Sequence, residues 1–153
     1  MEKINWNTKA FNDLTVNEYW EILHLRTAIF VVEQDCPYQE VDEKDRKSYH
    51  LFGRNEQDEV IATSRIVLPG ISYPEVSIGR VALKKEERGK GIADRMMLET
   101  FAFIGKTFGD VPVRISAQEY LKNFYSKHGF KQVSESYLED DIPHIEMLWG
   151  KVE

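Results

Sequence analysis

The segment that decides the fold reads Leu-Lys-Lys-Glu-Glu-Arg-Gly-Lys-Gly-Ile-Ala, residues 83–93. Before it, apolar residues at positions 76, 78, 81 and 83 nearly alternate, which predicts a strand with one slip in its register. After it, apolar residues recur at helical spacing from Gly91 to about Phe108. The segment is therefore predicted to join a strand to a helix, with two glycines and several cations where the helix begins.

This junction has the chemistry of a phosphate-binding site. The first N–H groups of a helix have no partner within the helix, and the helix dipole favours an anion beside them. Gly89 and Gly91 place no Cβ in the path of an approaching anion, and Arg88 and Lys90 add positive charge. The same residues also suit a plain turn with solvated charges, so the pattern alone leaves both interpretations open.

Two common phosphate-binding motifs do not fit the chain. A P-loop that ends in Gly105-Lys106-Thr107 would need a glycine at position 100, where the chain has threonine. A dinucleotide-binding Gly-x-Gly-x-x-Gly that starts at Gly89 would need a third glycine at position 94, where the chain has aspartate. A nucleotide-phosphate binder of either class is therefore the weakest interpretation.

Length and composition predict one soluble domain that spans residues 1–153. Apolar residues make up 42% and charged residues 30%, which is ordinary for a globular protein. The net charge of −6 argues against nucleic acid or an anionic membrane as a partner. It would suit a cationic amine, but a solvated acidic surface explains it more simply. Cys36 is the one cysteine, so no internal disulfide or metal site is expected. No signal peptide or membrane-spanning segment is recognisable, which predicts a cytoplasmic protein.

The first helix carries a start signal. Thr15 and Glu18 form a capping box, which predicts a helix from Val16 to about Phe30. Its expected apolar stripe consists of Trp20, Leu23, His24, Thr27, Phe30 and Val31, with His24 as a packing residue. Residues 30–45 follow as an irregular loop rich in acids. Composition leaves open whether this loop is functional or forms a solvated acidic surface.

The rest of the chain alternates between strand and helix patterns. Strands are expected over residues 4–11, 49–54, 60–68, 76–83, 111–116, 130–137 and 144–151, and helices over residues 91–108 and 119–128. Short turns join the second, third and fourth strands, which predicts an antiparallel meander. The strand–helix units that follow predict a mixed sheet with helices packed on it.

The pattern Arg88-x-x-Gly91-x-Ala93 resembles the acetyl-CoA pyrophosphate loop of the GNAT (Gcn5-related N-acetyltransferase) superfamily, and the element order is similar over nearly the whole chain. Longer and more specific motifs resemble the ElaA-type branch of that superfamily. They are Phe30-Val-Val-Glu-Gln-x-Cys-Pro-Tyr-x-Glu-x-Asp42, Ile78-Gly-Arg-Val81, Ala117-Gln118 and Asp141-Ile-Pro-His-Ile-x-Met147. The chain has Asp141 where branch members can have glycine, a departure that concerns only the local turn.

This resemblance implies an α/β acyl-CoA N-acyltransferase fold, with a central, mostly antiparallel sheet that is splayed between strands 4 and 5 and flanked by helices. A β-bulge in the fourth strand causes the splay, and the slip in alternation places it at residues 79–81. The resemblance also implies acetyl-CoA as cosubstrate. The residues implied to bind it are Val81, Ala82 and Leu83 beside the pantetheine arm, Arg88, Gly89, Lys90, Gly91, Ile92 and Ala93 around the pyrophosphate, and Asn123, whose motif matches only in part.

Transfer of an acetyl group to an amine needs a base for the amine and an acid for the departing thiolate. Tyr125 stands where the family has its general acid, although its spacing also suits a core aromatic residue. Candidates for the base are Glu75, Glu33 and His144, and the choice among them stays open. His144 is the first choice for a role at the substrate site. Glu33, Glu40 and Asp42 could attract an amine, whereas Arg80 and Arg65 could select an acidic group on the acceptor. Charge therefore does not identify the acceptor.

Two hypotheses follow from the resemblance. The first is an acetyl-CoA-dependent N-acetyltransferase that acts on the primary amine of a small molecule or a protein. The second is a module that binds acyl-CoA without transferring the acyl group and serves as a sensor or partner protein. The sequence does not distinguish a monomer from a homodimer.

Overall fold

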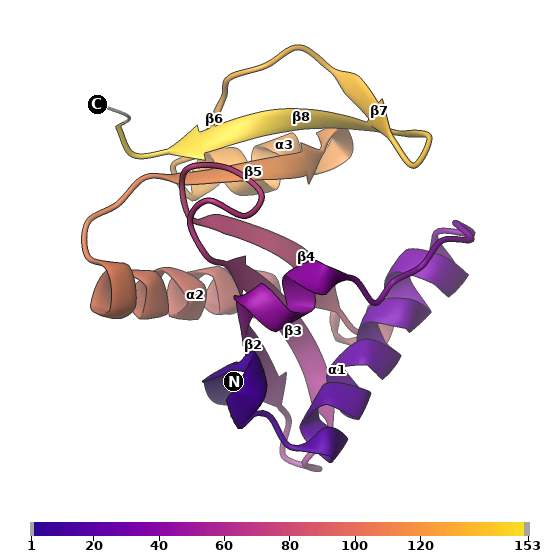
Figure 1. The fold of residues 1–153 in the computed structure, drawn as a ribbon. Helices are drawn as coiled ribbons and strands as arrows, with labels where there is room; N and C mark the ends of the chain where they lie inside the picture. Colours follow the sequence, from indigo (N-terminus) through magenta and orange to yellow (C-terminus); the bar gives the residue numbers. More distant parts are fainter. Residues whose placement is uncertain (1, 152–153) are drawn as a thin grey trace.

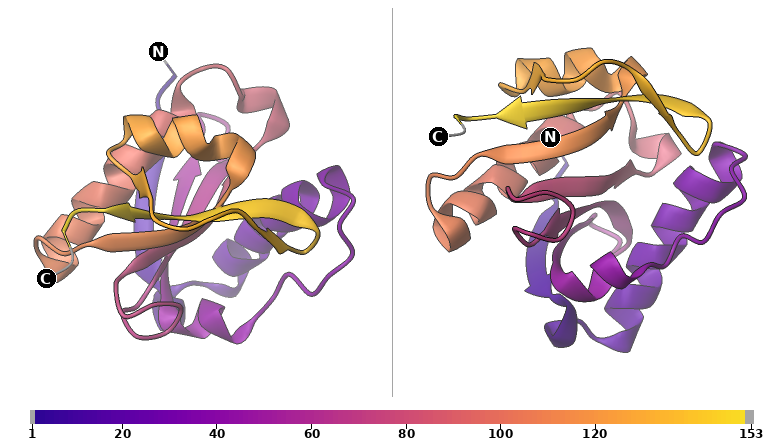
Figure 2. Two further views of the ribbon diagram at one scale, coloured as in Figure 1. Left: turned by 90° about the horizontal axis from the view of Figure 1, so that it is seen from above. Right: turned by 45° about the horizontal axis from the view of Figure 1, so that its top comes forward.

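The computed structural model describes residues 2–151, which form two antiparallel sheets (Figures 1 and 2). The first sheet has the spatial order β1 (Asn5–Ala10), β2 (Ser48–Arg54), β3 (Val60–Val67) and β4 (Ser77–Leu83). The second has the order β5 (Val113–Gln118), β8 (Ile142–Trp149) and β6 (Lys131–Gln132), and β7 (Tyr137–Glu139) also pairs with β8. The helices are α1 (Val16–Thr27), α2 (Ile92–Phe108) and α3 (Lys122–Lys127).

Helices cover both faces of the first sheet. Side chains of α1 pack with Phe52 and Val60, whereas side chains of α2 pack with the neighbouring residues Leu51 and Ile61. Because successive side chains of a strand point to opposite faces, the two helices lie on opposite sides. Strand β3 is consequently buried along its whole length. No helix among residues 2–151 combines the length and the apolar character needed to cross a bilayer.

The predicted bulge lies in β4. Thr63 pairs with Ala82 and Arg65 pairs with Gly79, so two residues, Arg80 and Val81, stand opposite one residue of β3. Arg80 has φ = 48°, in the left-handed region that favours glycine. Beyond the bulge β4 turns away from β5. Among the described residues one parallel bridge joins the two edges, between Val76, just before β4, and Val113 of β5. The predicted fold class, with its splay between strands 4 and 5, is confirmed.

The start of α1 is as predicted, but its buried face is not. The Thr15 hydroxyl accepts a hydrogen bond from the Glu18 amide and the Glu18 carboxylate accepts one from the Thr15 amide. The expected stripe is wrong for Trp20, which is 61% exposed and stacks on exposed His24. The buried face consists of Ile22, Leu25, Arg26, Ile29 and Phe30, and a π-helical segment (Ala28–Glu33) extends the helix. Arg26 can lie on this buried face because ion pairs with Glu40 and Asp45 neutralise it inside the protein.

The prediction of one long strand over residues 130–137 is wrong. Of residues 130–139, only those in β6 and β7 pair with β8, and the segment between these two strands arches along the edge of β8. Within that segment the Ser134 hydroxyl accepts a hydrogen bond from the Glu146 amide at 2.8 Å. A side chain thus replaces one backbone partner of β8, which keeps the amide paired without a continuous strand.

Candidate active site

A cleft of about 370 Å³ opens where β4 and β5 diverge. Most of the predicted site residues line it, namely Glu33, Arg80, Val81, Leu83, Arg88, Gly89, Ala93, Tyr125 and His144. The cleft therefore brings together residues from the π-helical segment, from β4, from the loop before α2, from α3 and from β8. The predicted residues Glu75, Ala82, Lys90, Gly91, Ile92 and Asn123 do not line it.

The loop at one end of the cleft has the geometry that an anion needs. Gly89 has φ = 81° and Gly91 has φ = 76°, and a Cβ built on either glycine would have no atom within 4 Å. Gly91 is the residue before the first turn of α2, and no side chain among residues 2–151 caps that turn. The first N–H groups of α2 are thus free of side-chain partners beside open space.

Arg88 is held in place at the mouth of the cleft. Its guanidinium donates two hydrogen bonds to the Glu33 carboxylate, at 2.8 and 3.0 Å, and one to the Leu83 carbonyl at 3.2 Å. Lys90 donates to Glu87 at 3.0 Å. Both cations of the loop are therefore paired with carboxylates. An incoming anion would compete with Glu33 for the two parallel N–H donors of Arg88, the Arg88 fork.

The backbone of β4 presents alternate groups to the cleft. The Lys84 amide donates to the Ile61 carbonyl of β3, at 2.8 Å. Backbone groups that face the same neighbour recur at every second residue, so the N–H and C=O of Ala82 also point toward β3. Val81 and Leu83 lie between these positions and point the other way, as the bond from Arg88 to the Leu83 carbonyl shows. The side chain of Ala82 is buried beneath α1 and does not line the cleft.

Tyr125 lies on α3, packed among aromatic rings at the floor of the cleft. Its ring makes edge contacts with Phe124 and Phe130, with centroids 5.1 and 5.7 Å apart. Burial raises the pKa of the Tyr125 hydroxyl above its ordinary value, and the charge of Tyr120 adds to this. The hydroxyl is therefore held in its protonated form, as a proton donor would have to be.

His144 lies on β8 with one ring nitrogen fixed and the other available. Its Nδ1 is 2.7 Å from the Ile142 carbonyl, which can only accept, so Nδ1 carries the proton. Nε2 then carries a lone pair, 3.4 Å from the nearer oxygen of the Glu139 carboxylate. If Nε2 takes up a proton, Glu139 is placed to pair with the resulting imidazolium.

Glu139 is a cleft residue that the sequence analysis missed. Its other oxygen lies 3.3 Å from the Ser116 hydroxyl, which in turn lies 2.5 Å from the Tyr137 hydroxyl. The hairpin of β7 and β8 could have revealed Glu139. Tyr137 pairs with His144 and Glu139 pairs with Ile142, so the hairpin brings Glu139 close to His144. The pairing could not be read from the sequence while residues 130–137 were assigned to one strand.

Two predicted site residues lie elsewhere. Glu75 accepts two hydrogen bonds from Arg114, at 3.1 and 3.2 Å, and these bonds lower the pKa of its carboxyl. The structure therefore places the Glu75 carboxylate against Arg114 and outside the lining of the cleft. Asn123 is exposed on α3 and does not reach the cleft.

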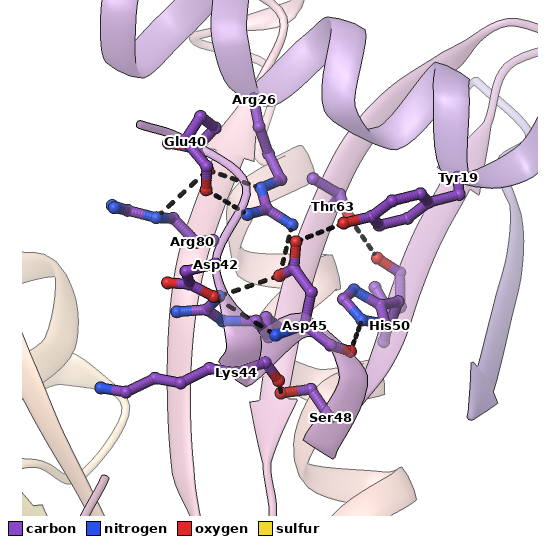
Figure 3. A network of polar contacts seen from close by, with 12 residues as sticks. Tyr19, Arg26, Glu40, Asp42, Lys44, Asp45, Ser48, His50, Thr63 and Arg80 are labelled. Carbon is purple, nitrogen blue, oxygen red and sulfur yellow. Dashed lines mark hydrogen bonds and ion pairs between the residues drawn. The ribbon is translucent and has the colours of Figure 1, made fainter. Parts of the chain in front are cut away.

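Six alternating charges form a chain that ends in the cleft, referred to below as the charge chain (Figure 3). Its order is Arg80, Glu40, Arg26, Asp45, Arg65 and Asp42, and the contacts along it measure 3.2, 2.7, 3.0, 2.9 and 2.7 Å. Glu40 and Asp45 are buried, so they are not part of a solvated acidic surface, one of the two interpretations left open for this loop. Arg65 and Arg80 were both predicted as possible partners for an acidic group on the acceptor. Arg65 pairs with two carboxylates and does not line the cleft, whereas Arg80 does line it.

The chain is similar to known acetyltransferases over almost its whole length. A family model described as an acetyltransferase (GNAT) domain matches residues 15–150. Protein ElaA of Escherichia coli is 38% identical over 146 residues, 94% of this chain and 95% of the relative. A UPF0039 protein of Synechocystis sp. is 37% identical over 147 residues, 96% of each chain.

Two solved structures have the same fold at similar identity. The crystal structure of an acyl-CoA N-acyltransferase from Pseudomonas aeruginosa has a TM-score of 0.91 at 39% identity, covering 97% of this chain and 100% of that one. The crystal structure of Escherichia coli ElaA has a TM-score of 0.90 at 37% identity, with the same coverage.

Proposed function

Because this chain belongs to the GNAT acetyltransferase family, in its ElaA-type branch, we propose that it moves the acetyl group of acetyl-CoA directly to a primary amine. The observation that carries the proposal is the cleft itself. One cavity joins the outward edge of β4, the glycine loop, a buried tyrosine and a histidine with a free ring nitrogen. These are the parts that direct transfer between a thioester and an amine requires.

Binding of the cosubstrate uses backbone groups. The amides of Val81 and Leu83 pair with the pantetheine arm much as an added strand would. The first N–H groups of α2, the open space over Gly89 and Gly91, and Arg88 receive the pyrophosphate. Lys90 lies outside the cleft and adds charge to the same loop.

Two side chains carry out the proton transfers that accompany acetyl transfer. His144 Nε2 takes a proton from the amine, whose nitrogen attacks the thioester carbon. An N–H of β4 stabilises the negative charge that develops on the carbonyl oxygen. The carbon–sulfur bond breaks, and the Tyr125 hydroxyl gives its proton to the sulfur. The acylated nitrogen loses its second proton as the amide forms, and this proton restores the Tyr125 hydroxyl. Glu139 steadies the protonated His144 until the proton passes to solvent.

Titration with acetyl-CoA, followed by an assay for free thiol, tests the proposal. The purified protein is titrated calorimetrically and then incubated with amino acids, polyamines and lysine peptides. Thiol release above the hydrolysis blank supports transfer, and a comparison of acetyl-CoA with longer acyl-CoA compounds tests the acetyl assignment. Binding without release for every amine favours the alternative, a non-catalytic acyl-CoA-binding module.

Substitution Gly91→Glu is expected to abolish binding of acetyl-CoA. A side chain at φ = 76° is strained, and its carboxylate would stand in the space proposed for the pyrophosphate. Calorimetry should show a loss of about 100-fold or more in affinity, in line with an unpaired like charge at a binding site. Gly105→Glu is the matched control, because Gly105 is exposed on α2, equally uncrowded, and outside the cleft. Unchanged affinity in Gly91→Glu would refute the pyrophosphate assignment.

Substitution Glu33→Gln is expected to tighten binding of acetyl-CoA by about two- to fivefold, the usual range for a partly exposed ion pair. The carboxylate occupies the Arg88 fork in the free protein, so its removal frees the fork for a phosphate and removes a repelling charge. Calorimetry at low salt measures the effect. Glu59→Gln is the control, since Glu59 pairs with Lys84 outside the cleft. Weaker binding in Glu33→Gln would mean that Glu33 itself contacts the ligand favourably.

A further inference from the structure

Arg80 is the end of the charge chain, and its side chain makes no hydrogen bond within residues 2–151. Its Nε is 3.2 Å from Glu40 but lacks the geometry of a hydrogen bond. Every interior charge of the chain has two partners of opposite sign, whereas Arg80 has one. In Figure 3 the outer end of its guanidinium points away from the other members of the chain. The outer nitrogens are therefore available to a further anion.

The surroundings hold Arg80 in this orientation. Its guanidinium carbon lies 4.9 Å from the ring centre of Phe30 and 5.3 Å from that of Tyr38. The Tyr38 hydroxyl donates to the other oxygen of Glu40, at 2.6 Å, and Glu40 is buried. An arginine fixed between two rings and a buried carboxylate loses little side-chain freedom when it binds a ligand, which favours affinity.

The bulge gives Arg80 its place in the cleft. A left-handed conformation at a residue other than glycine is strained, and it persists here because the flanking residues of β4 pair with β3. The same kink that separates β4 from β5 brings Arg80 to the lining of the cleft. The cation is thus built into the feature that creates the site.

We propose that the acceptor carries a carboxylate, bound by the free end of Arg80, in addition to the amine that receives the acetyl group. A guanidinium presents parallel N–H donors that match the two oxygens of a carboxylate. The other arginine of the cleft, Arg88, is engaged at the loop, and the acid Glu139 stands beside His144, where the amine would react. The cleft therefore offers a cation for the acidic group and an anion beside the base. This inference rests on the proposed function and names its substrate class.

Matched acceptor pairs test the inference. Glycine, β-alanine and L-glutamate are each compared with the corresponding compound whose carboxylate (the α-carboxylate in glutamate) is a carboxamide, and kcat/KM is measured by thiol release from acetyl-CoA. The acid-to-amide ratio is determined for the wild-type protein and for Arg80→Gln. Division of one ratio by the other cancels the intrinsic reactivity of each amine. We expect the preference for the acid to fall by about 10- to 100-fold in Arg80→Gln, the usual effect of a charge-assisted hydrogen-bonded pair.

Two further variants serve as controls, one for the loss of any arginine and one for the loss of the positive charge at position 80. Arg114→Gln removes an arginine that pairs with Glu75 and Glu146 outside the cleft, and it should keep the wild-type ratio. Arg80→Lys keeps the charge and loses the fork, so its preference should be intermediate, and it replaces Arg80→Gln if that protein does not fold. Melting curves and acetyl-CoA affinity report whether each variant is intact.

The outcomes separate the inference from the proposed function. Equal acid-to-amide ratios in the wild type and in Arg80→Gln would overturn the inference, while transfer to any amine would leave the proposed function standing. If acetyl-CoA binds and no amine of either kind increases thiol release, the proposed function fails and the inference falls with it.

Discussion

Substitution Tyr125→Phe is expected to lower kcat for acetyl transfer by about 10²- to 10⁴-fold, the range for loss of a positioned proton donor. The change removes one oxygen atom and leaves the ring in its aromatic contacts with Phe124 and Phe130. Affinity for acetyl-CoA should stay within about threefold, because the proposed binding contacts come from β4 and the loop before α2. Calorimetry and initial rates of thiol release with a saturating amine measure the two quantities separately.

A second tyrosine of the same core serves as the control. Tyr49 packs against the cluster that contains Tyr125, and its ring contacts Phe103 and Phe108 away from the cleft. Tyr49→Phe should therefore retain full activity. A kcat within about threefold of wild type in Tyr125→Phe would remove this residue from the mechanism. If neither protein turns over with any amine, the non-catalytic alternative gains support.

The protonation of Tyr125 also predicts how the rate of acetyl transfer by the wild-type protein depends on pH. Burial raises the pKa of the Tyr125 hydroxyl above its ordinary value of about 10. The donor therefore stays protonated through the neutral and moderately alkaline range. Rates should not fall between pH 7 and pH 10 through loss of this proton, and a fall that persists in Tyr125→Phe would have another source.

Substitution Arg26→Ala is expected to lower the free energy of unfolding by about 3–5 kcal/mol, the range for removal of one partner from a buried ion pair. The Arg26 side chain is 1% exposed and contacts two buried carboxylates, those of Glu40 and Asp45. Its loss leaves both less neutralised in the protein interior. Urea denaturation measures the change. Arg46→Ala, which breaks an exposed contact of 3.6 Å with Glu43, should stay within about 0.5 kcal/mol of wild type.

Measurements at low pH distinguish how much of the stability lost in Arg26→Ala comes from the ion pairs and how much from side-chain packing. Burial by itself would raise the pKa of Asp45, but the charge of Arg26 and the hydrogen bonds from Tyr19, Arg26 and Arg65 hold it below its ordinary value. The stability that this pairing contributes is present above the unfolded-state pKa of about 3.9 and is lost as the pH falls through the folded-state pKa. The difference between wild type and Arg26→Ala should therefore narrow in acid. A difference that does not change with pH would point to lost packing alone.

The sequence predicted those features that depend on local chemistry. The capping box at Thr15 and Glu18, the slip in alternation around Arg80 and the glycines before α2 each act through neighbours in the chain, and each lies where it was expected. The junction at residues 83–93 located one end of the cleft because strand, loop and helix follow one another directly.

Features that depend on distant partners were not predictable. Arg26 is buried because Glu40 and Asp45, 14 and 19 residues away, turn back onto α1. Glu139 reaches His144 through a hairpin whose register follows from pairing with β8. The arch over residues 133–136 is held by a side chain that replaces a backbone partner, a substitution that hydrophobic periodicity does not record.

The single bridge between Val76 and Val113 has a consequence for how the protein unfolds. Side chains of the core, rather than a backbone ladder, join the two sheets, with Ile78 from one and Ile115 from the other in the same cluster. Apart from the Arg114 amide, which donates to the Val76 carbonyl, amides on the facing edges lack a ladder partner among residues 2–151 that would slow their exchange with deuterium. A ligand strand along β4 would supply such a partner, so exchange at Val81 and Leu83 should slow when the cleft is occupied. The empty protein would then open along this seam at lower free energy than the occupied one.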